Sequence, residues 1–141
     1  MDFRLVTMFG IKEESTVYSV TLPTVTGEIS VFPGHEPYVT VAAPGIITVR
    51  YSKDDTDDML EYFGITGGVI EINQVGLRVL VDEADAADDV VESESVAAIE
   101  RARKMQSEAS DQVEIEKAHE LMDRHAVKLK VAELRRRKRN Y

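Results

Sequence analysis

The sequence predicts a mainly β protein with an α-helical end: an N-terminal antiparallel β-sandwich over residues 1–86 and a C-terminal antiparallel helical hairpin over residues 87–141. Two observations predict this class. Before Asp85, short runs of β-branched and aromatic residues alternate with turn residues at close spacing, which is typical of an all-β sandwich or barrel. From Asp85 onward glycine and proline are absent, and Ala, Glu, Lys and Arg dominate, which favours helix.

Eight strands are predicted in the first part of the chain. No helical pattern separates them, so parallel βαβ units are not expected. The predicted strands are Leu5–Phe9, Val17–Leu22, Glu28–Phe32, Tyr38–Val41, Ile46–Tyr51, Leu60–Ile65, Val69–Ile72 and Leu77–Val81. The plausible reversals between them are Thr26–Gly27, Pro33–Gly34, Pro44–Gly45 and Asn73–Gly76.

Two further segments have residues typical of binding sites, but we expect both to be structural. Gly67 and Gly68 precede a strand with no helix behind it, whereas a phosphate-binding loop needs a helix N-terminus after its glycines. We therefore expect a tight turn or a bulge where no side chain fits. The acidic run 53–58 is expected to be a solvated hairpin tip, because it lacks the glycine and the distal Glu of a calcium-binding EF-hand loop.

Two helices are predicted in the C-terminal part, interrupted at Ser110–Asp111. Asp89 with Glu92 and Asp111 with Glu114 have the spacing of N-terminal capping boxes. Each helix carries one narrow stripe of mostly small residues, and small residues bury little apolar area at ~25 cal/mol per Å². A weakly docked hairpin is the expected result. The stripes are Val91, Ser95, Ala98, Ala102, Met105 and Ala109, then Ile115, Ala118, Met122, His125, Leu129 and Ala132.

Composition excludes several classes of protein. The chain has no cysteine, so disulfides, thiolate nucleophiles and cysteine metal sites are excluded. No apolar run approaches the ~20 residues of a membrane span, and Met1–Arg4 does not resemble a targeting leader, so a soluble protein of a reducing compartment is expected. Residues 1–100 carry a net charge of −14 and residues 101–141 carry +5. The acidic first part argues against general nucleic-acid binding, which depends on neutralising phosphates.

The strongest motif is the segment Pro23–Pro37, which reads P-T-V-T-G-E-I-S-V-F-P-G-H-E-P. Gly45–Arg50, Gly67–Ile72 and Val79–Ala84 follow it. In this order and at this spacing, the four segments resemble the epsilon subunit of the F-type ATP synthase, the bacterial and chloroplast equivalent of the mitochondrial delta subunit. The resemblance is close over residues 16–86 and looser in the C-terminal third.

The resemblance implies a non-catalytic subunit of the central stalk. Such a subunit links the gamma subunit to the c-subunit ring, so that ion-driven rotation reaches the catalytic alpha and beta subunits. It uses no cofactor, binds no nucleic acid and does not insert into the membrane. It is peripheral on the cytoplasmic face of the bacterial cell membrane, as part of the complex.

The resemblance also implies which residues make these contacts. Carried over, Glu28, Gly34 and His35 contact the rotor. The basic end of the last helix contacts an acidic segment of a beta subunit and inhibits ATP hydrolysis; its members are Arg135, Arg136, Arg137, Lys138 and Arg139. ATP-binding members of the family resemble one another at I-D-x-x-R-A. Here Val91 and Glu94 stand in place of the Asp and the Arg, so ATP binding is not expected.

Alternatives from other classes stay open on the residues alone. One alternative is a ligand-binding β module with a helical oligomerisation tail. The apolar stripes of the predicted helices would then form a coiled coil between chains. A hydrolase centred on His35 lacks a partner nucleophile in the sequence pattern. No metal site is expected at His119 and His125, because metal pairs on helices favour four-residue spacing. The basic end also fits a favourable charge at a helix C-terminus, worth ~0.3–1 kcal/mol, or an anion-binding tail.

Overall fold

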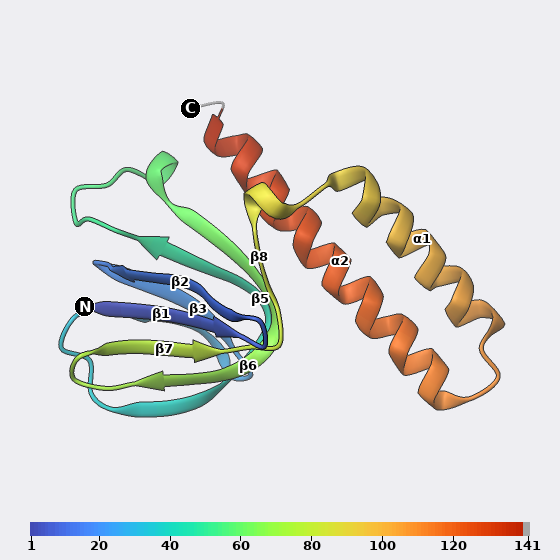
Figure 1. Cartoon of the computed structure of the whole chain (residues 1–141), viewed down its shortest axis with the longest axis horizontal. Helices are drawn as coiled ribbons and strands as arrows, with labels where there is room; N and C mark the ends of the chain where they lie inside the picture. The colour runs from blue at the N-terminus through green and yellow to red at the C-terminus, as the bar shows by residue number, and fades with distance from the viewer. Residues whose placement is uncertain (140–141) are drawn as a thin grey trace.

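The computed structural model of the chain describes the backbone of residues 1–139 and the side chains of residues 1–137. The side chains of Lys138 and Arg139, two members of the predicted basic end, lie outside the described residues. The described part is a curled β-sheet followed by two helices (Figure 1). The elements are β1 (Asp2–Thr7), β2 (Gly10–Thr16), β3 (Ser19–Thr24), β4 (Gly27–Val31), β5 (Tyr38–Arg50), η1 (Asp57–Met59), β6 (Glu61–Ile72), β7 (Gly76–Leu80), β8 (Ala84–Ala86), η2 (Ala87–Asp89), α1 (Glu92–Glu108) and α2 (Gln112–Arg139).

The strands form one hydrogen-bonded sheet in the order β2-β1-β7-β6-β5-β3-β4, with β8 also paired to β6. All neighbours are antiparallel except β1 and β7, which are parallel. The long strands β5 and β6 belong to both layers of the sandwich. The first part of β6 pairs with β8 and its last part pairs with β7. The predicted sandwich and helical hairpin are therefore confirmed, with one parallel pair added.

Gly67 and Gly68 lie where β6 passes from one layer to the other. Phe63 and Ile65 point into the core before the glycines, and Ile70 and Ile72 point into it after them, so the inward positions change from odd to even. The glycines have φ values of 124° and 150°, which residues with a Cβ rarely adopt. A Cβ on Gly68 would also overlap the Leu80 carbonyl oxygen. The expectation that no side chain fits is confirmed at Gly68, whereas the expected turn or bulge is not seen, because β6 continues through both glycines in one register with β5.

The structure differs from the predicted strands and turns in several places, and the predicted pairs of strands 38–41 with 46–51 and 60–65 with 69–72 are the single strands β5 and β6. Pro44–Gly45 is not a reversal, because β5 continues through it. A Cβ on Gly45 would lie 2.9 Å from the Pro23 Cβ, so the glycine serves close packing between neighbouring strands. The strands β2 and β8 were not predicted. The polar edge strand β2 forms because β1 supplies its hydrogen-bond partners, and such pairing outweighs the low β-propensity of its Lys and Glu residues.

The core of the sandwich is built within residues 3–84 from buried Val, Leu, Ile, Phe and Ala side chains. α2 crosses the outside of the sheet, and α1 lies on the far side of α2 (Figure 1). The contact between α2 and the sheet depends on Gly64. A Cβ there would lie 2.8 Å from Val127 Cγ1 and 3.0 Å from Val131 Cγ2. None of the described helices is long and apolar enough to cross a membrane.

Of the two predicted N-terminal caps, the one before α2 forms and the one before α1 does not. Glu114 N donates to Asp111 Oδ1 at 2.8 Å, so the predicted cap at Asp111 is confirmed. The Glu114 carboxylate accepts in turn from Ser110 N at 3.3 Å, one residue before the cap. The predicted cap at Asp89 is wrong, because α1 is preceded by Val91 without a side-chain cap. Asp89 is occupied instead by an ion pair with Lys12 of β2.

The predicted helix stripes are buried only in part. Ser95, Ala102, Ala118 and Ala132 are buried, whereas Val91 and Met105 are exposed.

Candidate functional site

The loop between β4 and β5 holds two of the predicted rotor-contact residues, Gly34 and His35. Gly34 has a φ of 85°, the left-handed conformation that favours glycine. His35 N donates to the Phe32 carbonyl at 3.3 Å and closes the turn. The His35 Nδ1 lies 2.7 Å from the Glu36 carbonyl oxygen. Because a carbonyl oxygen only accepts hydrogen bonds, Nδ1 is the donor, and the other nitrogen of the neutral ring carries no proton. Nε2 is then the acceptor that His35 offers to a partner.

Glu28, the third predicted rotor-contact residue, lies at the other end of β4. It is the second residue of the strand, whereas His35 follows the last residue by four positions. At about 3.3 Å per strand residue, the chain carries the two side chains well apart. Glu28 lines a groove of about 520 Å³ between the sheet and α2, together with Lys130 and Leu134. The sequence motif did not indicate this groove, because it arises only when α2 docks on the sandwich.

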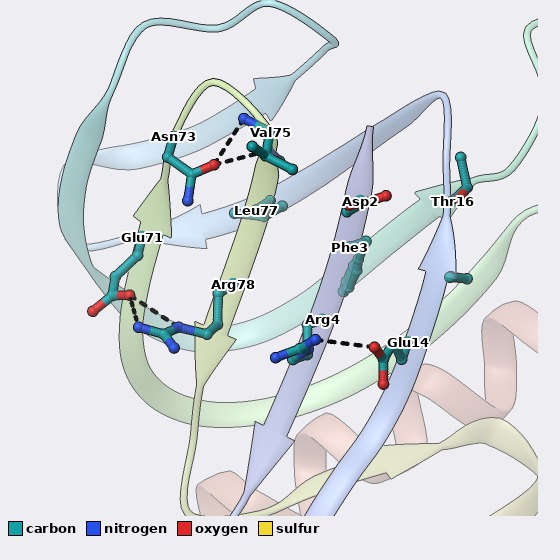
Figure 2. A pocket seen from close by; sticks show the side chains of 12 residues that line it. Asp2, Phe3, Arg4, Glu14, Thr16, Glu71, Asn73, Val75, Leu77 and Arg78 are labelled. Atoms are coloured by element: carbon teal, nitrogen blue, oxygen red, sulfur yellow. Dashed lines mark hydrogen bonds and ion pairs between the residues drawn. The ribbon is translucent and has the colours of Figure 1, made fainter.

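The face of the sandwich formed by β2, β1, β7 and the last part of β6 is not covered by the helices (Figure 1). A row of charges crosses it in a shallow pocket of about 590 Å³ (Figure 2). Arg4 Nη2 donates to Glu14 Oε1 at 3.0 Å, and Arg78 Nε donates to Glu71 Oε2 at 3.0 Å. Because each guanidinium has its own carboxylate, the row has no net charge and does not form an anion site.

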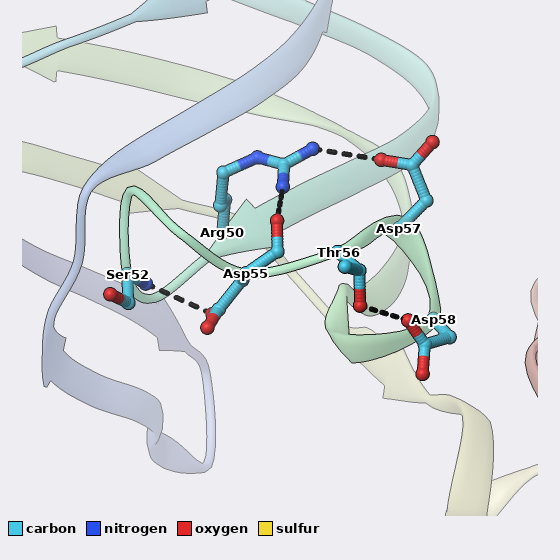
Figure 3. A network of polar contacts seen from close by, with 6 residues as sticks. All are labelled: Arg50, Ser52, Asp55, Thr56, Asp57 and Asp58. Atoms are coloured by element: carbon cyan, nitrogen blue, oxygen red, sulfur yellow. Dashed lines mark hydrogen bonds and ion pairs between the residues drawn. The ribbon is translucent and has the colours of Figure 1, made fainter.

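The acidic run 53–58 is largely exposed, as expected, and its turn is held by hydrogen bonds (Figure 3). Arg50 donates to the Asp55 carbonyl and, through Nη2 at 2.9 Å, to Asp57 Oδ1. Ser52 N donates to Asp55 Oδ2 at 3.0 Å. One cation therefore organises the turn. Among the residues that the structure describes, no group of three or more His, Cys, Asp or Glu side chains is placed to hold a metal ion.

Two titratable side chains have altered pKa values. Burial raises the pKa of Tyr51 to about 12, and the Glu13 and Glu61 carboxylates add to the effect. Burial lowers the pKa of His125, and the Lys128 and Arg124 cations lower it further. His125 Nδ1 lies 3.4 Å from Ser95 Oγ across the two helices. His125 is therefore a packing residue of the hairpin, as the stripe predicted.

The described members of the basic end are each paired with a carboxylate of the same chain. Arg135 pairs with Asp88, Arg136 Nε lies 3.4 Å from Glu92 Oε1, and Arg137 Nη2 lies 2.7 Å from Glu133 Oε1. Asp88 and Glu92 were not predicted as partners of these arginines. The opposite charges of the two parts of the chain were the signal that could have indicated them.

The stretch expected not to bind ATP lies at the start of α1. Val91 is half exposed and precedes the helix, and Glu94 is exposed in its first turn. Glu94 therefore presents a negative charge to solvent where the ATP-binding pattern has an arginine.

Known structures share this fold. A chain of the Euglena gracilis mitochondrial ATP synthase, solved as OSCP/F1/c-ring, superposes with a TM-score of 0.73 over 92% of this chain and 79% of its own length, at 24% identity. A chain of the Tetrahymena thermophila mitochondrial ATP synthase central stalk and c-ring gives a TM-score of 0.58 over 94% of this chain and 96% of its own, at 14% identity. Both superpose on more than nine-tenths of this chain, which shows that the fold is shared.

The sequence comparisons agree. Residues 1–87 match the family model described as ATP synthase, Delta/Epsilon chain, beta-sandwich domain. The chain therefore belongs to the ATP synthase delta/epsilon family. The ATP synthase epsilon chain of Rippkaea orientalis is 29% identical over 94% of this chain and 96% of its own. That of Xanthomonas campestris pv. campestris is 32% identical over 79% and 76%.

Within the family, the function of this chain is that of an epsilon subunit, a component of a rotary F-type ATP synthase. The family relationship favours this function over that of a free-standing ligand-binding module.

Proposed function

We propose that the chain is the non-catalytic coupling subunit between the gamma subunit and the c-subunit ring. Through it, ion-driven rotation reaches the catalytic alpha and beta subunits. The observation that carries the proposal is a match along 94% of the chain and 96% of the relative, which includes the hairpin as well as the sandwich. In this role the chain needs no cofactor and lies at the cytoplasmic face of the bacterial cell membrane without entering it.

The proposed rotor contact combines the exposed loop around Gly34 and His35 with Glu28. A turn that fixes the His35 ring and leaves Nε2 as an acceptor supports a polar contact with a partner chain. Glu28 and His35 lie at opposite ends of β4, so each can be tested without disturbing the other.

The test of the rotor contact uses single variants in the assembled complex. Glu28→Ala and His35→Ala are each expected to change the free energy of unfolding by less than roughly 0.5 kcal/mol, because neither side chain is buried. Each is expected to lower ATP-driven ion pumping relative to ATP hydrolysis in membrane vesicles. Glu36→Ala, an exposed change in the same loop, is the matched control. Unchanged pumping in both variants would remove these residues from the site.

The basic end of α2 is proposed to contact an acidic surface of the catalytic head and to inhibit ATP hydrolysis. Arginine pairs with carboxylates in a bidentate geometry. Exposed pairs are worth only ~0–1 kcal/mol each, so inhibition requires several together. Deleting residues 134–141 is expected to raise ATP hydrolysis by the purified complex while assembly stays intact. Equal hydrolysis with and without the segment, at low and at high salt, would reduce the cluster to a solubilising helix end.

A further inference from the structure

An acidic segment joins the sandwich to α1 and runs beside α2. It comprises residues 82–94 and contains seven Asp or Glu and no Lys or Arg. Four ion pairs connect it to α2, and the partners follow each other in the same order along both segments. The pairs are Glu83 with Arg124, Asp85 with Lys128, Asp88 with Arg135 and Glu92 with Arg136.

The spacing on α2 suits such a ladder. Arg124, Lys128 and Arg135 are separated by four and seven residues, which places them on one face of a helix with 3.6 residues per turn. Lys128 and Asp85 form the most enclosed of the four pairs, with side chains 18% and 19% exposed and 3.6 Å between Nζ and Oδ1. The other pairs are nearer to solvent and are screened more strongly by salt.

The acidic segment is itself fixed to the sandwich. β8, which lies within it, pairs with β6, and Asp89 forms an ion pair with Lys12 of β2. The rest of the hairpin's attachment is modest, because the buried helix residues are mainly small and the apolar contact with the sheet centres on Gly64. The four ion pairs therefore add to a modest apolar contact in holding α2 against the sandwich.

We propose that the acidic segment is an electrostatic latch for α2, and that it competes with the catalytic head for the basic end. The competition rests on the proposed function. Arg135 and Arg136, assigned to an acidic surface of the head, are held here by Asp88 and Glu92. The same guanidinium groups cannot pair with both surfaces at once. Weakening the latch therefore releases the hairpin and strengthens the inhibition of ATP hydrolysis.

The latch is tested first on the isolated full-length chain. Asp85→Asn with Asp88→Asn removes two charges that face α2, and hydrogen–deuterium exchange of the α2 amides reports undocking. Exchange at low salt is expected to rise about five- to thirty-fold, which corresponds to about 1–2 kcal/mol. The wild-type chain is expected to approach the variant as salt reaches about 1 M, where the screening length is about 3 Å.

The control removes the same charge from the same segment. Asp82 and Glu94 are exposed and make no ion pair among the described side chains, so Asp82→Asn with Glu94→Gln is expected to leave exchange unchanged. A charge exchange, Asp88→Arg with Arg135→Asp, is expected to restore protection that Arg135→Asp alone removes. Wild-type protection in Asp85→Asn/Asp88→Asn at low salt would overturn the latch.

Measurements on the assembled complex distinguish the latch from the proposed inhibition of ATP hydrolysis by the basic end. With Asp85→Asn/Asp88→Asn, ATP hydrolysis is expected to fall below that of the wild type, because Arg135 loses its partner and α2 is released to the head. Faster exchange with unchanged hydrolysis would support the latch and refute the proposed inhibition by the basic end. Unchanged exchange would refute the latch whatever the hydrolysis rate.

Discussion

Gly64→Ala is expected to loosen the hairpin without harming the sandwich. The new Cβ would lie 2.8 Å from Val127 Cγ1 and 3.0 Å from Val131 Cγ2, closer than ordinary van der Waals contact. Valine is stiff at χ1, so the clash is relieved mainly by moving α2 away. Phe63 and Ile65 point into the core from the other face of β6 and are not disturbed. Overpacking of this kind costs about 1–3 kcal/mol, here taken from hairpin docking.

Hydrogen exchange of α2 and thermal unfolding of the sandwich measure the two parts separately. Gly64→Ala is expected to raise α2 exchange while the sandwich melts as in the wild type. Val131→Ala alone also weakens docking, since burying a valine is worth about 1.5–3 kcal/mol, but it makes room for the new methyl group. The double variant should therefore cost less than the sum of the two. Unchanged α2 protection in Gly64→Ala, or strict additivity, would refute the close-contact argument.

Three further expectations follow from the same structure. Truncation after Ala86 should leave a cooperatively unfolding β domain, because the sandwich core lies within residues 3–84; a disordered fragment would contradict the domain boundary. Calorimetry at millimolar ATP should show little heat with Glu94 in place of an arginine, and a one-to-one micromolar isotherm would contradict this. Packing of α1 against α2 should weaken as pH falls below 6.5, the ordinary pKa of histidine, because His125 binds a proton more readily when the two helices separate than when it is buried between them. His125→Gln should remove that pH dependence in hydrogen exchange.

Local sequence patterns predicted the features that depend on neighbouring residues. The cap that Asp111 forms on the Glu114 amide is present as expected. The reversal at Asn73–Gly76 also forms, since Asn73 Oδ1 accepts hydrogen bonds from Val75 N at 2.8 Å and Gly76 N at 3.0 Å (Figure 2). A turn or a cap is closed by side chains a few residues away, so its signal is contained in a short stretch of sequence.

Features that depend on distant partners were not predicted. Pro44–Gly45 has the composition of a turn, but Gly45 packs on Pro23 within a continuous strand. Asp89 has the spacing of a cap but pairs with Lys12, which lies on β2 at the far end of the sequence. In each case tertiary packing decided between local alternatives that the sequence left open.

In the candidate site, too, the local features were predicted and the contacts between distant residues were not. The motif identified the loop that holds His35. Glu28 is close to His35 in the sequence but lies near the start of β4, and the rest of that strand separates the two residues. The charge difference between the two parts of the chain indicated two kinds of surface, and the structure shows that these surfaces meet. The pairing of Arg135 with Asp88 could not be predicted without the docked position of α2.

The central claim is that this chain works as the epsilon subunit of a rotary ATP synthase, between the gamma subunit and the c-subunit ring. Affinity purification of the tagged full-length chain from native membranes, with mass-spectrometric identification of its partners, tests it most directly. One copy of the chain per complex is expected, together with the gamma, alpha, beta and c subunits. Recovery of the chain alone or as a homo-oligomer, with the ATP synthase left intact in the unbound fraction, would contradict it.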